Sequence, residues 1–150
     1  MDVKVKTEPR DLSKLPKKMQ KKVQEKVKSA LFRVAQIGIN IILDRTERGV
    51  GYKRGQFRPY SEKYAAFRAE KGRGLKPNLN FTGQMLGSIT SKANSKQAEI
   101  FFRGATASAK ASKNNKSRPF FGFNRAEKKK LAKKFEGFMQ WALEKKLQTI

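Results

Sequence analysis

Apolar residues recur every three or four positions over a long stretch near the start of this chain. The stretch runs from about Ser13 to Arg48, and its apolar positions are Leu15, Met19, Val23, Val27, Leu31, Val34, Ile37 or Gly38, Ile41 and Ile42. This spacing predicts one apolar face on a long α-helix that ends at Gly49. The part from Leu31 to Leu43 is the most apolar and is the expected core. Such a helix would measure about 50 Å, so we expect either a break near Gly38 or an N-terminal half that extends beyond the body of the protein.

A second helical pattern follows the aromatic segment Arg118–Asn124 (RPFFGFN). Pro119 and Gly122 constrain this segment, and its phenylalanines Phe120, Phe121 and Phe123 are expected in the core. Asn124 and Glu127 have the spacing of a helix N-cap and capping box. The apolar positions that follow are Leu131, Phe135, Phe138, Met139, Ala142 and Leu147. We therefore predict a buried aromatic corner that leads into an amphipathic C-terminal helix.

Shorter elements lie between these two patterns. Ser61 can cap a short helix that stops at Gly72, and Thr82 can cap a helical turn that contains Met85 and Leu86. The segment Gln97–Arg103 has the composition of a strand and would pair with Leu86–Ala93 in an antiparallel hairpin. The expected fold class is α+β: a long N-terminal helix and an amphipathic C-terminal helix packed on a small antiparallel β-sheet, with long basic loops.

The expected domain organisation is a flexible N-terminal arm over residues 1–12 and a single domain over 13–150. Val3 and Val5 could instead make the arm a short edge strand. Two segments are predicted to be loops: Gly49–Pro59, which is rich in glycine, and Gly104–Ser117, which has no large apolar residue and is expected to be mobile.

The chain is strongly basic. It has 36 Lys and Arg against 12 Asp and Glu, a formal net charge of +24 over 150 residues. A field of this sign favours a polyanionic partner, whether nucleic acid, an anionic membrane surface or an acidic protein. Charge alone does not distinguish these partners.

Several function classes are excluded by composition. The chain has no cysteine and no histidine, so it lacks thiolate ligands, the commonest metal ligand and the commonest acid–base catalyst. Asp44 and Glu47 are one helical turn apart, but Asp44 with Arg45 and Arg48 is better interpreted as a surface ion-pair group. We expect no enzyme activity, no metal and no cofactor. We find neither an apolar run of membrane-spanning length nor a signal peptide, and expect a soluble, cytoplasmic protein.

The candidate contact residues lie in the two predicted loops and beside the aromatic corner. In Gly49–Pro59, aromatic and basic residues alternate in a way that suits stacking of single-stranded nucleic acid, although we favour aromatics that attach the loop to the core. Arg118 could pair with Glu99 or with a neighbouring subunit. The full set of candidate contacts is Tyr52, Lys53, Arg54, Phe57, Arg58, Lys110, Lys113, Lys116 and Arg118.

Several short motifs occur in a characteristic order. After the helix end Ile42–Arg45 come FRPYSEKYA (Phe57–Ala65), LNFTGQMLGSI (Leu79–Ile89), EIFF (Glu99–Phe102) and RPFFG (Arg118–Gly122). Together they resemble the tailed-bacteriophage virion morphogenesis family, the neck and tail-completion proteins of the head–tail junction. The resemblance covers about residues 30–147, and its structural positions here are Thr82, Gly83, Pro119, Phe120, Phe121 and Gly122. The chain departs from the family in the stretch GATASAKASKNNK and in its high charge.

The resemblance implies a structural protein of the virion, assembled in the host cytoplasm. It implies a ring of copies of this chain, placed between portal or head-completion proteins and tail-terminator or tail-tube proteins. The DNA in the channel is a further possible partner, and no membrane is implied. Two alternatives remain: a basic nucleic-acid-binding protein associated with the ribosome or nucleoid, and a small hydrolase or nuclease, which would need a carboxylate cluster that the sequence lacks.

Overall fold

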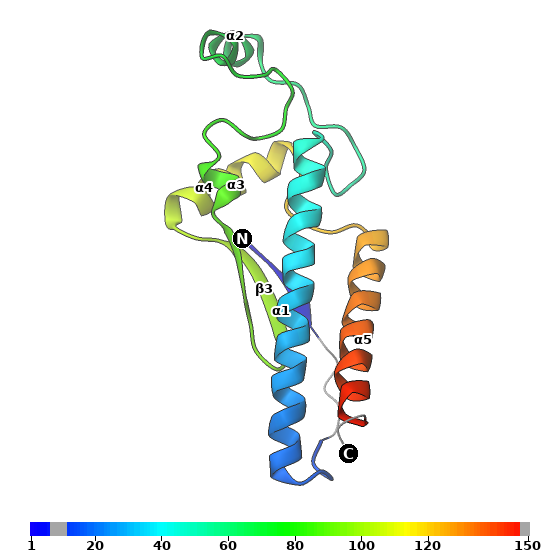
Figure 1. Ribbon diagram of the computed structural model, residues 1–150. Helices are drawn as coiled ribbons and strands as arrows, with labels where there is room; N and C mark the ends of the chain where they lie inside the picture. The colour runs from blue at the N-terminus through cyan, green and yellow to red at the C-terminus, as the bar shows by residue number, and fades with distance from the viewer. Residues whose placement is uncertain (7–11, 148–150) are drawn as a thin grey trace. The chain divides into compact units, whose positions relative to one another are not determined.

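The computed structural model describes residues 1–6 and 12–147 (Figure 1). These residues have an α+β fold with five helices, among them a long N-terminal helix, and a three-stranded antiparallel sheet. In chain order the elements are β1 (Asp2–Lys6), α1 (Lys17–Glu47), α2 (Glu62–Glu70), α3 (Gln84–Gly87), β2 (Ile89–Ala93), β3 (Gln97–Phe102), α4 (Ala105–Ser117) and α5 (Arg125–Leu147).

The chain divides into two compact units. The corner unit consists of Met1, Asn40–Ile89 and Phe102–Asn124. The sheet unit consists of Asp2–Ile39, Thr90–Phe101 and Arg125–Ile150. Each unit has its own set of buried apolar side chains.

Helix α1 is continuous through Gly38, so the expected break near that residue does not occur. It begins just after Pro16, whose carbonyl accepts hydrogen bonds from the N–H groups of Met19 and Gln20. Leu31 and Val34 are fully buried, while Met19 is exposed. The more apolar second half of the helix therefore contributes to the core, as its sequence predicts.

The three strands lie in the order β1–β3–β2. Strands β2 and β3 form the expected hairpin, which turns where the Asn94 N–H donates to the Gln97 carbonyl at 2.9 Å. Strand β1 pairs antiparallel with β3, from Asp2 opposite Phe101 to Lys6 opposite Gln97. The expected flexible arm is therefore wrong for residues 2–6, which form the alternative edge strand; residues 7–11 lie outside the described part of the chain.

The core of the sheet unit lies where α1 meets the sheet and α5. Ala98 and Ile100 alternate on the buried face of β3. The Gln36 side chain of α1 donates to the Ser91 hydroxyl of β2 at 2.8 Å. On α5, which begins directly after the expected cap residue Asn124, Leu131 and Ala142 are buried. The side chain of Leu147, also expected on the apolar face, lies outside the described part.

The predicted mobile loop Gly104–Ser117 is wrong, because residues 105–117 form helix α4. The segment lacks large apolar residues, but its alternate alanines have the highest intrinsic helix propensity. Ala111 is fully buried, and α4 contacts α3. Small side chains allow a helix to pack close to its neighbour. The spacing of large apolar residues gives no indication of such a helix. The α4 lysines Lys110, Lys113 and Lys116 are all exposed.

This packing predicts opposite outcomes for two alanines of α4. Ala111→Leu inserts extra atoms at a fully buried position and should lower the free energy of unfolding by about 1–3 kcal/mol. Ala109→Leu, on the exposed side, should change it by less than about 0.5 kcal/mol. Urea denaturation followed by circular dichroism measures both. Equal effects would mean that α4 does not pack as described.

Candidate functional site

The aromatic corner is the centre of the corner unit. Phe120, Phe121 and Phe123 are all buried, as predicted. The side-chain oxygen of Asn115 accepts the N–H groups of Phe120 and Phe121, each at 2.9 Å. The Phe102 ring lies 6.1 and 4.8 Å from these two rings, centroid to centroid. The end of α4 therefore fixes the backbone of the corner while β3 supplies an aromatic contact.

Arg45 holds the corner from the other side. Its Nη2 donates to the Phe120 carbonyl at 2.6 Å and to the Gly122 carbonyl at 2.9 Å, and the residue is 4% exposed. The interpretation of Arg45 as part of a surface ion-pair group is therefore wrong. Arg48 instead donates to the main-chain carbonyl of Asp44 at 3.3 Å and is exposed. A basic residue inside an apolar helical face is the sequence signal for such a buried arginine.

The loop Gly49–Pro59 is attached to the corner through its backbone and aromatics. The Tyr52 N–H donates to the Pro119 carbonyl at 3.0 Å, and Phe57 is buried. A Cβ on Gly122 would lie 2.9 Å from the Tyr52 ring, so glycine is required for this close approach. The favoured interpretation, that these aromatics attach the loop to the core, is confirmed. The basic residues Lys53, Arg54 and Arg58 remain exposed.

Arg118 joins the end of α4 to the end of this loop. Its Nε donates to the Arg58 carbonyl at 2.8 Å and its Nη2 to the Pro59 carbonyl at 2.9 Å. The guanidinium also lies over the Tyr60 ring, 4.9 Å from its centroid. The proposed pairing with Glu99 is therefore replaced by main-chain carbonyls, and Glu99 pairs with Lys92 at 3.0 Å.

Arg68 is a buried cation that the sequence pattern does not single out. It is 2% exposed, and it donates through Nε to the Gly74 carbonyl at 2.8 Å and through Nη2 to the Asn80 carbonyl at 3.1 Å. Its guanidinium lies 4.8 Å from the Tyr60 ring centroid and 5.7 Å from that of Phe81. Arg68 thus links helix α2 to the segment that follows it, through hydrogen bonds to carbonyls and contacts with aromatic rings.

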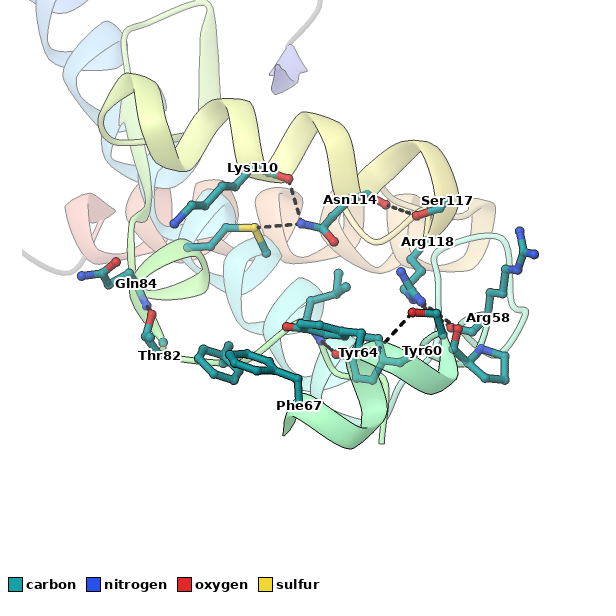
Figure 2. Close-up of a pocket in the computed structure, with 16 residues that line it drawn as sticks. Arg58, Tyr60, Tyr64, Phe67, Thr82, Gln84, Lys110, Asn114, Ser117 and Arg118 are labelled. Carbon is teal, nitrogen blue, oxygen red and sulfur yellow. Dashed lines mark hydrogen bonds between the residues drawn. The ribbon is translucent and has the colours of Figure 1, made fainter. Parts of the chain in front are cut away.

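A groove of about 990 Å³ lies between α2 and α4 in the corner unit (Figure 2). Its aromatic side chains form a row in which Tyr64 and Phe67 stack at 6.1 Å and Phe67 and Phe81 at 5.6 Å, centroid to centroid. Tyr64 and Phe67 are about two-fifths exposed, at 37% and 42%. The lining contains cations but no acidic residue; it consists of Arg58, Pro59, Tyr60, Ser61, Tyr64, Phe67, Leu79, Phe81, Thr82, Gly83, Gln84, Met85, Lys110, Asn114, Ser117 and Arg118.

The groove brings together some of the predicted contact residues but not others. Arg58, Lys110 and Arg118 line it. The remaining candidates lie elsewhere in the corner unit: Tyr52, Lys53, Arg54, Phe57, Lys113 and Lys116. Tyr64 and Phe67, the exposed aromatics of α2, lie three residues apart and are not among the predicted contact residues. Their exposure could not be inferred because the same spacing is typical of a buried face.

The turn before α3 differs in detail from the prediction. The cap position is Gly83, whose φ of +82° favours glycine, and the expected cap Thr82 lies one residue earlier. The Thr82 hydroxyl still accepts the Gln84 N–H at 3.4 Å. At α2 the prediction is confirmed, since the Ser61 hydroxyl accepts the Tyr64 N–H at 3.3 Å.

The described residues contain no group of three or more carboxylates that could hold a metal ion. A hydrogen bond from Lys4 lowers the pKa of the Asp2 carboxyl, and both residues lie on β1. No helix within residues 1–6 and 12–147 combines the length and apolarity of a membrane span. The groove lining offers aromatic rings and cations.

Comparison with protein-family models, with curated proteins and with solved structures finds no match to this chain.

Two glycines of the loop should respond differently to alanine. A Cβ at Gly51 would lie 2.7 Å from the Pro119 carbonyl oxygen, whereas one at Gly55 would meet nothing within 4 Å. Gly51→Ala should therefore lower the free energy of unfolding by about 1–3 kcal/mol. Gly55→Ala should leave it unchanged or raise it by up to about 1 kcal/mol. Thermal and urea denaturation would show this; a harmless Gly51→Ala would rule out the close contact between loop and corner.

Replacing Arg45 should loosen the corner. Arg45→Met removes the donor of two carbonyls and should lower the free energy of unfolding by about 1–3 kcal/mol. Arg48→Met makes the same substitution at an exposed side chain and should cost less than about 0.5 kcal/mol. If the two variants unfold at the same urea concentration, Arg45 does not hold the corner.

Proposed function

We propose that this protein is a structural subunit of a bacteriophage head–tail junction, a neck or tail-completion protein that forms a ring around the DNA channel. The supporting observation is that the motifs that resemble the phage family are hydrogen-bonded to one another. Arg118 of RPFFG binds the carbonyls of Arg58 and Pro59 in FRPYSEKYA. Tyr60 of that second motif accepts the N–H of Leu79, the first residue of the third, at 3.1 Å. Hydrogen bonds thus connect three motifs that lie apart in the sequence.

The groove is the surface that we assign to a protein partner in the junction. It combines exposed aromatic rings with cations and lacks acidic lining residues. Aromatic and arginine side chains are enriched in protein interfaces. A net charge of +24 opposes association between copies unless opposite charge meets it, so an acidic surface on the portal or tail side is the complementary partner.

We also propose that α5 acts as the amphipathic C-terminal element of this subunit. Leu131 and Ala142 are buried in the sheet unit, and exposed lysines occupy another face of the same helix. That lysine face is the specific observation that favours the second candidate function, a basic nucleic-acid-binding protein of the ribosome or nucleoid.

Electron microscopy of phage particles that lack this gene tests the proposal. We expect filled heads separate from complete tails, with joining restored by the wild-type gene in trans. Joined and infectious particles without the protein would overturn the ring proposal and favour the nucleic-acid-binding alternative.

Charge reversal within and outside the groove refines the test. Arg58→Glu with Lys110→Glu alters the groove, while Arg54→Glu with Lys113→Glu makes the same charge change at exposed residues outside it. We expect only the first pair to fail in restoring joined particles, provided that both proteins fold by circular dichroism. Equal restoration by both pairs would contradict the role of the groove.

A further inference from the structure

A second groove, of about 950 Å³, lies in the sheet unit. Cations and aromatic rings line it, and none of its lining residues is acidic. The lining residues are Arg33, Ala126, Lys129, Lys130, Lys133, Lys134, Gly137, Phe138 and Trp141. The junction role proposed above assigns no ligand to this groove.

The groove follows from the sequence of α5. The four lysines that line the groove form two pairs, Lys129 with Lys130 and Lys133 with Lys134, which repeat after one helical turn of about 5.4 Å. The small residues Ala126 and Gly137 lie on the same face, three or four positions before and after the pairs. A Cβ at Gly137 would meet nothing within 4 Å, so the space above this face is open. The helix therefore presents a concave strip edged by ammonium groups.

One end of the strip carries a planar cation and an indole. Arg33, which comes from α1, places its guanidinium 5.6 Å from the Phe138 ring centroid and 5.7 Å from that of Trp141. Trp141 is 48% exposed, so much of its ring surface remains accessible. A guanidinium held beside an exposed indole can contact both a phosphate and the face of a base.

The arrangement is electrostatically unfavourable in the protein alone. Lys129 and Lys133, and likewise Lys130 and Lys134, are like charges four residues apart on one helix, which destabilises a helix. An anion in the groove would relieve this repulsion.

We propose that this groove binds the phosphate backbone of nucleic acid, with the lysine pairs on phosphates and with Arg33 and Trp141 at the end of the strip. The repeated charges match a polymer with regularly spaced anions, and the exposed indole suits a nucleotide better than a carboxylate side chain. The inference concerns the isolated protein and does not depend on its place in a ring. Its failure would therefore leave the particle-joining test unaffected.

The chain offers a matched control for the experiment. Lys17, Lys18, Lys21 and Lys22 on α1 have the same spacing as the α5 lysines, are all exposed and do not line the groove. We would substitute glutamine for all four residues in one set or the other. The two variants then have equal net charge, and circular dichroism checks that both fold.

The probe is a short fluorescein-labelled DNA duplex, titrated at several salt concentrations between about 50 and 200 mM. Each lysine–phosphate contact contributes about 0.9 to the slope of log affinity against log salt. The α5 variant should therefore lose about 3–4 from this slope and bind at least about tenfold more weakly. The α1 variant should lose less than about one.

The fluorescence of Trp141 locates the ligand, because it is the only tryptophan in the sequence. We expect saturating DNA to change its emission in the wild type and in the α1 variant. Equal losses of slope in the two variants, or unchanged emission on DNA saturation, would overturn the proposal. Tighter binding of polyglutamate than of DNA, with a change in Trp141 emission, would also overturn it and identify an acidic protein as the occupant.

Discussion

The guanidinium of Arg45 is the constraint on which the corner unit depends. It binds the carbonyls of Phe120 and Gly122, at the bend where regular secondary structure cannot satisfy them. With the bend fixed, the Pro119 carbonyl is in place to accept the Tyr52 N–H, and Asn115 can accept the two phenylalanine N–H groups. Helix α1, the loop after it and the end of α4 therefore meet at one backbone turn.

The chain accommodates its own positive charge in two ways. Arg45, Arg68 and Arg118 donate to main-chain carbonyls and lie beside aromatic rings, so these cations serve as structural cross-links. The lysines of α4, and those of α5 between residues 128 and 134, remain exposed and form the basic surface. Arginine suits the first role because its planar fork can bind two acceptors at once, whereas lysine behaves as a hydrated point charge.

Helical periodicity was sufficient to predict much of the fold. It located α1, the beginning of α5 and the buried phenylalanines, because large apolar side chains at regular spacing strongly favour a helix with one buried face. It failed for α4, where the buried Ala111 belongs to a segment of small and polar residues. It also failed for β1, where the pairing of Val3 with Ile100 depends on a strand almost a hundred residues away. Local patterns carry little information about such distant partners.

The candidate site was harder to predict than the fold. Arg58, Lys110 and Arg118 were identified from charge, but their common groove depends on α4 being a helix. The lysines and the tryptophan of α5 were visible in the sequence, while Arg33 beside them comes from a different helix. Sequence spacing identifies which residues share one helical face, but not which residue of another element completes the surface.

The use of carbonyl partners has a consequence for behaviour in acid. Many proteins unfold at low pH because carboxylates that pair with cations become protonated and the pairing is lost. Arg68 and Arg118 instead donate to the carbonyls of Gly74, Asn80, Arg58 and Pro59, and a peptide carbonyl does not titrate in this range. Protonation of carboxylates therefore does not break these hydrogen bonds of the corner unit. They remain at pH values low enough to disrupt ion pairs.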